Sequence, residues 1–207
     1  MLYEPRVLAR TSRKVPFLWK PIGPYAYGDP TWCAVEIGPD VLDRRADHLL
    51  LERLERLGRV RCDLLIVQEL DSSDVKTGWP IHRLLQMRDR GLCSFFAIET
   101  TEPLEAEWIA LNTPFHALVI PYLRQQMDVR FRVFRAAEES GVALLARASC
   151  PEDLALQHAT PEIVASLTEL DPDELPVVDP EAVWKQYQQD HPAPPRLRSG
   201  HPPETGA

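Results

Sequence analysis

The feature that most constrains the fold is the segment at residues 61–71, RCDLLIVQELD, where an apolar run ends abruptly on polar residues. The four aliphatic residues at 64–67 are too few for a periodic helix. A continuous apolar run of this length between polar residues is typical of a strand covered on both faces. The segment therefore predicts a buried strand of a parallel sheet.

A helical pattern precedes this strand at residues 40–60. Apolar residues recur there at close to a 3.6-residue period, at Val41, Leu42, Ala46, Leu49, Leu50, Leu54 and Leu57. Gly58 then predicts the end of the helix. Helix, glycine, strand and polar strand end form the repeating unit of an α/β protein, in which the carboxyl ends of the strands carry the chemistry. Gln68, Glu69 and Asp71 are therefore the first candidate functional residues.

The composition excludes several classes of partner. The chain has 207 residues, of which 44% are hydrophobic, enough for one domain with a sizeable core. A net charge of -8 and a pI near 5.3 argue against a nucleic-acid surface, which needs clustered Lys and Arg. No apolar run approaches the roughly 20 residues that span a bilayer, and no signal-like segment follows Met1. We expect a cytoplasmic protein with no nucleic-acid or membrane partner.

The cysteines predict free, buried thiols. They are Cys33, Cys62, Cys93 and Cys150. No C-x-x-C pair occurs, and no paired histidines lie nearby. Oxygen ligands at the strand ends, such as Glu69 and Asp71 together with Glu99, could in principle hold a divalent ion. No D-x-D spacing supports this, so we predict no metal site.

Further strands and helices alternate along the chain. Strands are predicted at residues 15–20, 62–68, 92–98, 116–122 and 142–148. Helices are predicted at residues 81–91, 102–112 and 129–141, and residues 72–80 are predicted to be a polar loop. Gly91 and Gly141 supply two of the helix ends.

The pattern weakens after residue 150. Residues 161–170 and 181–189 each predict a short helix. The end of the chain is too rich in Pro and too poor in apolar residues to order itself. We therefore divide the chain into one α/β domain at residues 1–170 and a mostly disordered tail at residues 171–207.

The helix-strand unit at residues 49–71 resembles the aldo-keto reductases, whose signature there runs roughly S-L-x-R-L-G-x-x-x-x-D-L-L-x-x-H-x-x-D. The matching residues are Leu51, Leu54, Leu57, Gly58, Asp63, Leu64, Leu65 and Asp71. Weaker likeness continues in the same order over roughly residues 6–150. The resemblance implies a (β/α)8 barrel that passes hydride from NADPH to a carbonyl. In the family a Tyr, tuned by Lys, His and Asp, protonates the carbonyl oxygen.

Two alignments of the N-terminal segment with the family compete. In the first, VPFLWKPIGPY at residues 15–25 resembles the third barrel strand, V-x-L-A-T-K-V-G-P, and Lys20 falls on the catalytic lysine. In the second, RVLARTSRKVP at residues 6–16 resembles the opening hairpin, R-x-L-G-R-T-G-L-K-V-P, which closes the barrel bottom. We favour the first, because the helix at residue 41 then follows without a gap. A solvated lysine at a strand end is the alternative role for Lys20.

The catalytic residues implied by the resemblance are Lys20 and Gln68. The family's catalytic histidine falls on Gln68, which can orient a carbonyl by donating one hydrogen bond. In the favoured alignment the chain begins after the family's Asp and Tyr. Tyr25 and Tyr27 lie near Lys20 in the sequence but beyond the third strand, so we expect neither to be catalytic.

The residues implied at the cofactor are Glu99, Thr100, Val119 and Arg147. Glu99 and Thr100 stand where the family has a Ser-Asn pair that grips the nicotinamide amide, and an ionised carboxylate cannot donate the hydrogen bond of an Asn. Val119 replaces an amide-binding Gln. Arg147 replaces a Tyr that stacks under the ring, and its cation repels an oxidised nicotinamide. We expect NADPH to bind weakly or not at all.

Five strands do not close an eight-stranded barrel. We therefore predict a partial TIM-barrel-like fold, with strands missing at the N-terminal and C-terminal ends, and homo-oligomers that cover the open edges. The leading hypothesis is an aldo-keto reductase-like protein with lost or strongly weakened reductase activity. The alternatives are an NADPH-dependent carbonyl reductase of reduced form, with a small aldehyde or ketone substrate, and a non-enzymatic interaction module.

Overall fold

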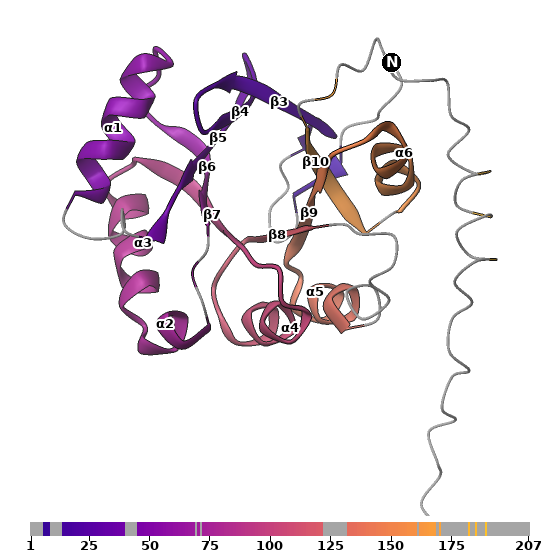
Figure 1. The fold of residues 1–207 in the computed structure, drawn as a ribbon. Coiled ribbons are helices and arrows are strands. Elements are labelled where there is room, and N and C mark those ends of the chain that lie inside the picture. The colour runs from indigo at the N-terminus through magenta and orange to yellow at the C-terminus, as the bar shows by residue number, and fades with distance from the viewer. Residues whose placement is uncertain are drawn as a thin grey trace, which may run out of the picture.

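A closed barrel of eight strands forms the centre of the molecule (Figure 1). The computed structural model describes residues 6–8, 14–39, 45–68, 70, 72–121, 132–160, 162–168 and 170, together with positions 182, 185 and 189. The strands follow one another around the barrel in the order β10-β3-β4-β5-β6-β7-β8-β9, and β9 pairs with β10 to complete the ring. The prediction of a partial barrel is therefore wrong.

The elements alternate along the chain as an α/β protein requires. The barrel strands are β3 (Leu18–Gly23), β4 (Ala26–Asp29), β5 (Trp32–Ile37), β6 (Cys62–Val67), β7 (Cys93–Glu99), β8 (Ala117–Pro121), β9 (Ala143–Ala148) and β10 (Ile163–Thr168). The helices are α1 (Ala46–Arg56), α2 (Ser72–Thr77), α3 (Trp79–Asp89), α4 (Pro103–Asn112), α5 (Phe134–Ser140) and α6 (Pro151–Ala159). None of these described helices is long and apolar enough to cross a bilayer.

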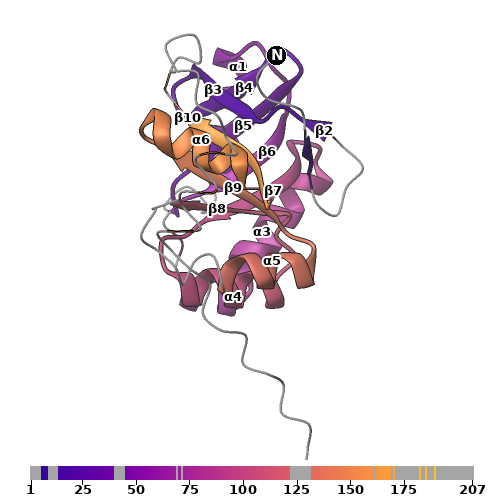
Figure 2. The same cartoon turned by 90° about the vertical axis from the view of Figure 1, so that its right-hand side faces the viewer.

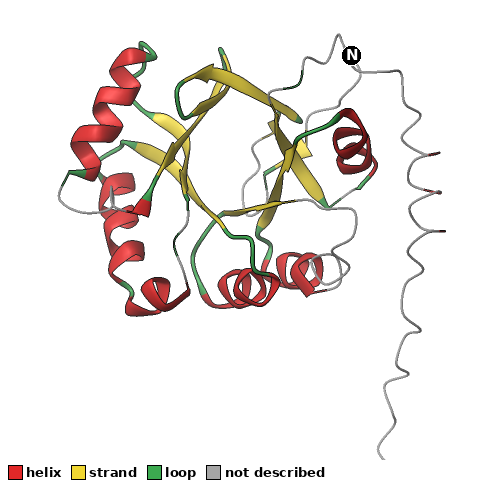
Figure 3. Ribbon diagram, in the orientation of Figure 1, coloured by secondary structure: helices red, strands yellow, loops and turns green. Residues whose placement is uncertain are grey.

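One strand runs against all the others. β4 pairs antiparallel with both β3 and β5, whereas every other pair in the barrel is parallel. An antiparallel neighbour needs only a tight turn, so β3 and β4 form a hairpin with no helix between them. The helices surround the rest of the ring, and Figure 3 shows none between β3 and β4. A strand overlapping β3 was predicted at residues 15–20, but β4 was not predicted.

The N-terminal segment forms a second hairpin, in which β1 (Arg6–Val7) pairs with β2 (Lys14–Val15). Leu8 and Val15 are buried in the cluster that fills the barrel interior, as expected of a hairpin that closes the bottom. The second of the two alignments is therefore the correct one. Figure 2 shows β2 beside the ring rather than within it. Lys20 lies on β3, the first barrel strand along the chain, and not on the third.

The barrel interior is filled by side chains at alternate strand positions, as the two-residue period of a strand requires. Two tryptophans and a phenylalanine stack across it: the rings of Trp19 and Trp32 are 5.5 Å apart, and those of Trp32 and Phe95 are 6.4 Å apart. Aliphatic residues such as Leu64 and Ile66 complete this interior cluster. The outward positions pack instead against the helices.

The helix ends follow the glycine signals in the sequence. After α1, Gly58 adopts φ 65°, a left-handed conformation that costs glycine nothing. Its N–H donates to the Glu55 carbonyl oxygen, and the Arg59 N–H donates to that of Leu54. This is a Schellman motif. Gly91 and Gly141 end α3 and α5 in the same way, so these three predicted ends are confirmed.

Several predicted elements differ from the structure. Residues 163–168 form β10 rather than a helix, because pairing on both sides with β9 and β3 decides the conformation of a short apolar segment. Residues 72–77 form α2 rather than a loop, and α6 was not predicted. The tail predicted at residues 171–207 lies outside the described residues, apart from three positions.

The thiols agree with the sequence. Cys33, Cys62 and Cys93 are free and buried, and Cys150 is partly exposed. Burial raises the pKa of Cys62 well above its ordinary value and that of Cys93 to about 12. Both thiols therefore stay protonated at neutral pH and act as small apolar groups.

Candidate functional site

Polar side chains replace apolar ones at the carboxyl ends of the barrel strands. Glu36 on β5 and Glu99 at the end of β7 each continue an inward-facing row of interior residues. Gln68 follows β6 on the same row, and Arg147 does so on β9. Tyr27 on β4 packs against the interior cluster. We call these five residues the mouth cluster.

Arg147 lies at the centre of the mouth cluster. Its Nε donates to Glu99 Oε1 at 2.6 Å and its Nη2 donates to Glu99 Oε2 at 2.8 Å, so this pair is bidentate. Nη2 also donates to Glu36 Oε1. Nη1 lies 3.3 Å from the hydroxyl oxygen of Tyr27. One guanidinium on β9 thus contacts side chains of β4, β5 and β7.

Both the side chain and the backbone of Glu36 form hydrogen bonds. Its side chain is 4% exposed, and its second carboxylate oxygen accepts a hydrogen bond from Gln68 Nε2 at 3.1 Å. Its backbone N–H donates to the Tyr25 carbonyl oxygen at 2.8 Å, and its own carbonyl oxygen accepts from Arg53. Burial raises the pKa of Glu36, although the charge of Arg147 opposes this. Its carboxylate is the most deeply enclosed charge of the mouth cluster.

Hydrogen bonds from α6 and β10 hold the backbone of Arg147 in position. Gln157 on α6 donates to the Arg147 carbonyl oxygen at 3.0 Å and accepts a hydrogen bond from Ser166 at 2.6 Å. Burial acts to lower the pKa of Arg147, but its hydrogen bonds and the charges of Glu99 and Glu36 outweigh burial and raise it. The guanidinium is therefore charged at all physiological pH values.

The structure brings together three of the six predicted site residues: Gln68, Glu99 and Arg147. Thr100 is buried beside them, where its N–H donates to the Val119 carbonyl oxygen at 3.1 Å. Val119 lies inside the barrel among apolar side chains.

Lys20 lies apart from the mouth cluster. It pairs with Gly28 on β4. Its neighbour Trp19 points into the barrel, so the alternation of the strand directs Lys20 to the outer face.

Metal ligation finds no support in the described residues, which contain no group of three or more His, Cys, Asp or Glu side chains placed to hold an ion. Two of the oxygen ligands considered from the sequence, Glu69 and Asp71, lie outside these residues. Within the mouth cluster, Glu36 and Glu99 both bind Arg147 instead.

Comparison with known proteins bears on the fold. No protein-family model and no curated protein sequence matches the chain. Solved structures do match. An aldo-keto reductase from Bacillus halodurans in its holo form has a TM-score of 0.59 at 11% identity, over 93% of this chain and 92% of that chain. The chain has the aldo-keto reductase fold.

Two further structures agree with this assignment. A thermostable aldo-keto reductase in complex with the inhibitor epalrestat has a TM-score of 0.54 at 16% identity, over 75% of this chain and 70% of that chain. An aldo-keto reductase from a Medee basin deep-sea metagenome library has a TM-score of 0.55 at 11% identity, over 75% and 69%. The resemblance noted in the sequence is thereby confirmed for the fold.

The closed barrel also corrects the position of the family's lysine. β5 is the third barrel strand along the chain, and residues 34–39, AVEIGP, fit the A-T-K-V-G-P end of the family pattern at Ala34, Gly38 and Pro39. Glu36 therefore stands where the aldo-keto reductase pattern has its catalytic lysine. This fit was the signal that could have identified Glu36 from the sequence. Tyr27 was considered from the sequence and set aside, because it was expected to lie beyond the third strand, whereas it lies on β4, the second barrel strand along the chain.

Proposed function

We propose that this protein is an aldo-keto reductase-fold protein whose carbonyl reductase activity is lost or strongly weakened. The observation that carries the proposal is the ion cluster at the barrel mouth, where Arg147 binds both Glu36 and Glu99. In the family pattern the corresponding region has to admit a carbonyl and a nicotinamide. Here its polar groups are engaged with one another.

The charge at the lysine position argues against the family's mechanism. That mechanism needs a cation to lower the pKa of a phenol, since an ordinary phenol near 10 gives up its proton poorly at pH 7. A carboxylate at position 36 has the opposite effect on a neighbouring phenol. Gln68, at the histidine position, can donate a hydrogen bond but cannot take up a proton.

The residues present do not fit the nicotinamide of NADPH. Glu99 stands at the position of an Asn that donates to the amide, and both of its carboxylate oxygens accept from Arg147. Arg147 in turn stands where a neutral ring would stack. Donors of this kind are each worth about 3 kcal/mol in a transition state, so their loss together argues against efficient turnover.

NADPH titration of the folded protein tests the proposal. We expect no saturable change in NADPH fluorescence up to about 1 mM NADPH. This concentration is well above the dissociation constant for NADPH that an efficient reductase needs. A matched control is the Leu51→Ala variant, which changes an exposed residue of α1 and should behave identically. Saturable binding in the micromolar range, with turnover of any aldehyde, would contradict the proposal.

A second candidate function has one observation in its favour. The Tyr27 hydroxyl lies 3.3 Å from the Arg147 guanidinium, and a cation beside a phenol makes the phenol a better proton donor. Under this alternative the protein is a carbonyl reductase of reduced form that takes its proton from Tyr27. An aldehyde and ketone screen with NADPH separates the two: activity that disappears in Tyr27→Phe supports the alternative, and absence of activity in the wild type rejects it.

A further inference from the structure

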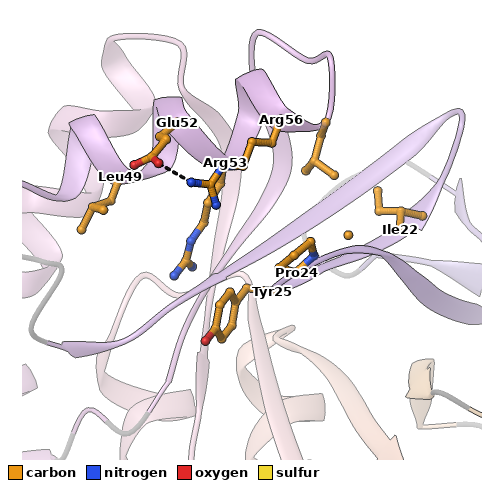
Figure 4. A pocket seen from close by; sticks show the side chains of 9 residues that line it. Ile22, Pro24, Tyr25, Leu49, Glu52, Arg53 and Arg56 are labelled. Atoms are coloured by element: carbon orange, nitrogen blue, oxygen red, sulfur yellow. Dashed lines mark hydrogen bonds and ion pairs between the residues drawn. The ribbon is translucent and has the colours of Figure 1, made fainter.

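A groove lies outside the barrel, between α1 and the hairpin of β3 and β4. It has a volume of about 470 Å³, within the range of small-molecule sites. One wall is the turn of the hairpin, which includes Ile22 and Tyr25, and the other is the face of α1 that carries Leu49, Glu52 and Arg53 (Figure 4). Leu57, which follows α1, completes this wall. The groove exists because β3 and β4 are joined by a turn and not by a helix that would fill this space.

Tyr25 is the most unusual residue of the groove. It is the only non-glycine residue of the described chain with a positive φ, 58°, in a turn position that normally favours Gly or Asn. Its side chain is 60% exposed, although it is a large aromatic residue. Neither feature helps the hairpin to fold, since a glycine would adopt this backbone without strain. Backbone strain of this kind is found preferentially at ligand sites.

Arg53 supplies a charge to the same groove. Its guanidinium lies 4.4 Å from the centre of the Tyr25 ring, and one of its nitrogens donates to the Glu36 carbonyl oxygen. Both contacts fix its orientation. The structure gives it no carboxylate partner among the described residues, and burial lowers its pKa. The charges of Glu36 and Glu52 act on Arg53 without a direct ion pair, so its planar fork remains able to bind the carboxylate or phosphate of a ligand.

The second arginine of the groove differs in this respect. Arg56 is exposed and forms an ion pair with Glu52 on the same helix, one turn away (Figure 4). Its charge is therefore already compensated. The remaining lining is mostly aliphatic, from Leu49, Leu57 and Ile22, and the Glu52 carboxylate that also lines the groove is paired with Arg56. The groove thus combines the Arg53 cation, the exposed Tyr25 ring and aliphatic side chains.

We propose that this groove binds a small organic anion with a flat apolar body, such as an aromatic carboxylate. The carboxylate pairs with Arg53, the ring stacks on Tyr25, and the apolar body covers the leucines of α1. The site is separate from the mouth cluster, and the proposal does not depend on whether the protein binds NADPH. The two regions meet only at Glu36, whose backbone is held by Tyr25 and Arg53.

Titration with a matched pair of probes tests the charge requirement. We expect the full-length protein to bind 2-naphthoate, measured by calorimetry and ligand-observed NMR, at least about tenfold more tightly than the neutral 2-naphthamide, since a charge-assisted hydrogen bond is roughly twice as strong as a neutral one. Equal affinity for the two probes, or no binding of 2-naphthoate at millimolar concentration, overturns the proposal.

Variants test the residues. Tyr25→Gly removes the ring while its backbone suits φ 58°, so it should fold normally and bind 2-naphthoate about tenfold more weakly, as expected for loss of ring stacking. Arg53→Lys keeps the charge but loses the fork and should weaken binding similarly. Arg56→Ala should have less than about a threefold effect, because its charge is paired with Glu52. Unchanged binding in both Tyr25→Gly and Arg53→Lys contradicts the proposal.

Sedimentation of the same variants tests a competing occupant. If the groove were instead covered by a second copy of the chain, Tyr25→Gly would change the oligomeric state in the absence of any ligand. The proposal requires that the state of the wild type and of Tyr25→Gly be the same. A shift towards monomer in the variant overturns it.

Discussion

The lower interior of the barrel and its mouth are built by the same strands but have opposite chemistry. Below, Trp19, Trp32 and Leu64 are fully buried among apolar neighbours. Above, the inward-facing rows of β5, β7 and β9 end in charged residues, and Glu36 and Arg147 bind each other. We therefore expect the lower layers to contribute most of the stability of the barrel, and the last inward residues to contribute less. In barrels of this class the carboxyl ends carry function and the opposite end carries stability.

The largest expected effect belongs to the lower interior. Trp19→Ala removes a side chain with 0% exposure that stacks on Trp32, and it should lower the free energy of unfolding by about 3–5 kcal/mol. Because no charge is involved, the loss should be the same at pH 5 and pH 8 in urea denaturation. Leu51→Ala, at an exposed site on α1, should change stability by less than about 0.5 kcal/mol. A pH-dependent loss for Trp19→Ala would break the distinction between the two regions.

The second largest loss of stability is expected from removing the Arg147 cation at the centre of the mouth cluster. Arg147→Met leaves the carboxylates of Glu36 and Glu99 without their partner, and since Arg147 is partly exposed we expect a loss of about 2–3 kcal/mol at pH 8. The loss should be smaller at pH 5, because Glu36 can then take up a proton in place of its ion pair. Denaturation at the two pH values measures this. An equal loss at both would mean that Arg147 stabilises the fold by packing and not by charge.

A smaller effect is expected from the amide at the mouth. Gln68→Ala removes the hydrogen bond to Glu36 at 3.1 Å and should cost about 1 kcal/mol of unfolding free energy. Gln68→Glu is the informative companion, because it places a third carboxylate beside Glu36 and should cost more at pH 8 than at pH 5. If Gln68→Glu is as stable as the wild type at pH 8, the mouth is more open to water than its contacts indicate.

The smallest expected effect is a change in how steeply the free energy of unfolding depends on pH. Burial raises the pKa of Glu36 in the folded chain, so the folded state binds more protons than the unfolded state above pH 4.5, the ordinary value for this carboxyl. The contribution of Glu36 to the free energy of unfolding therefore falls as the pH rises through its pKa in the folded state. Glu36→Gln removes this contribution, so its stability should decrease less than that of the wild type between pH 5 and pH 8. Parallel curves for the two proteins would refute the raised pKa.

Local signals predicted much of the chain correctly. The strands β6, β7 and β9 are apolar runs that lead into polar residues, and the helices α1, α3 and α5 each end at a glycine. Gln68 and Glu99 were found because each stands at the end of a recognisable strand, and Arg147 because the aldo-keto reductase pattern has a Tyr at its position. Their common location at the mouth follows from parallel strands sharing one edge.

Other elements were hidden by their local sequence. β5 is interrupted by Glu36, so its apolar run is too short to be recognised, although all six of its residues are buried. β10 has apolar residues at a spacing that suits a helix equally well. Because β5 was missed, Glu36 was absent from the predicted site. Because β4, β5 and β10 were all missed, Tyr27 was set aside and the barrel was predicted to be open.

The sequence by itself determined which segments bury their side chains and at which residues several strands and helices end, since apolar periodicity and glycine conformation act over a few residues. The tertiary structure alone decided that the barrel closes, because closure depends on the pairing of β10 with β3, whose partners are more than a hundred residues apart in the chain. It also decided that Glu36, Glu99 and Arg147 form one ion cluster. That contact exists only because three separate strands end at the same mouth, where the two carboxylates compensate the charge of a half-buried guanidinium.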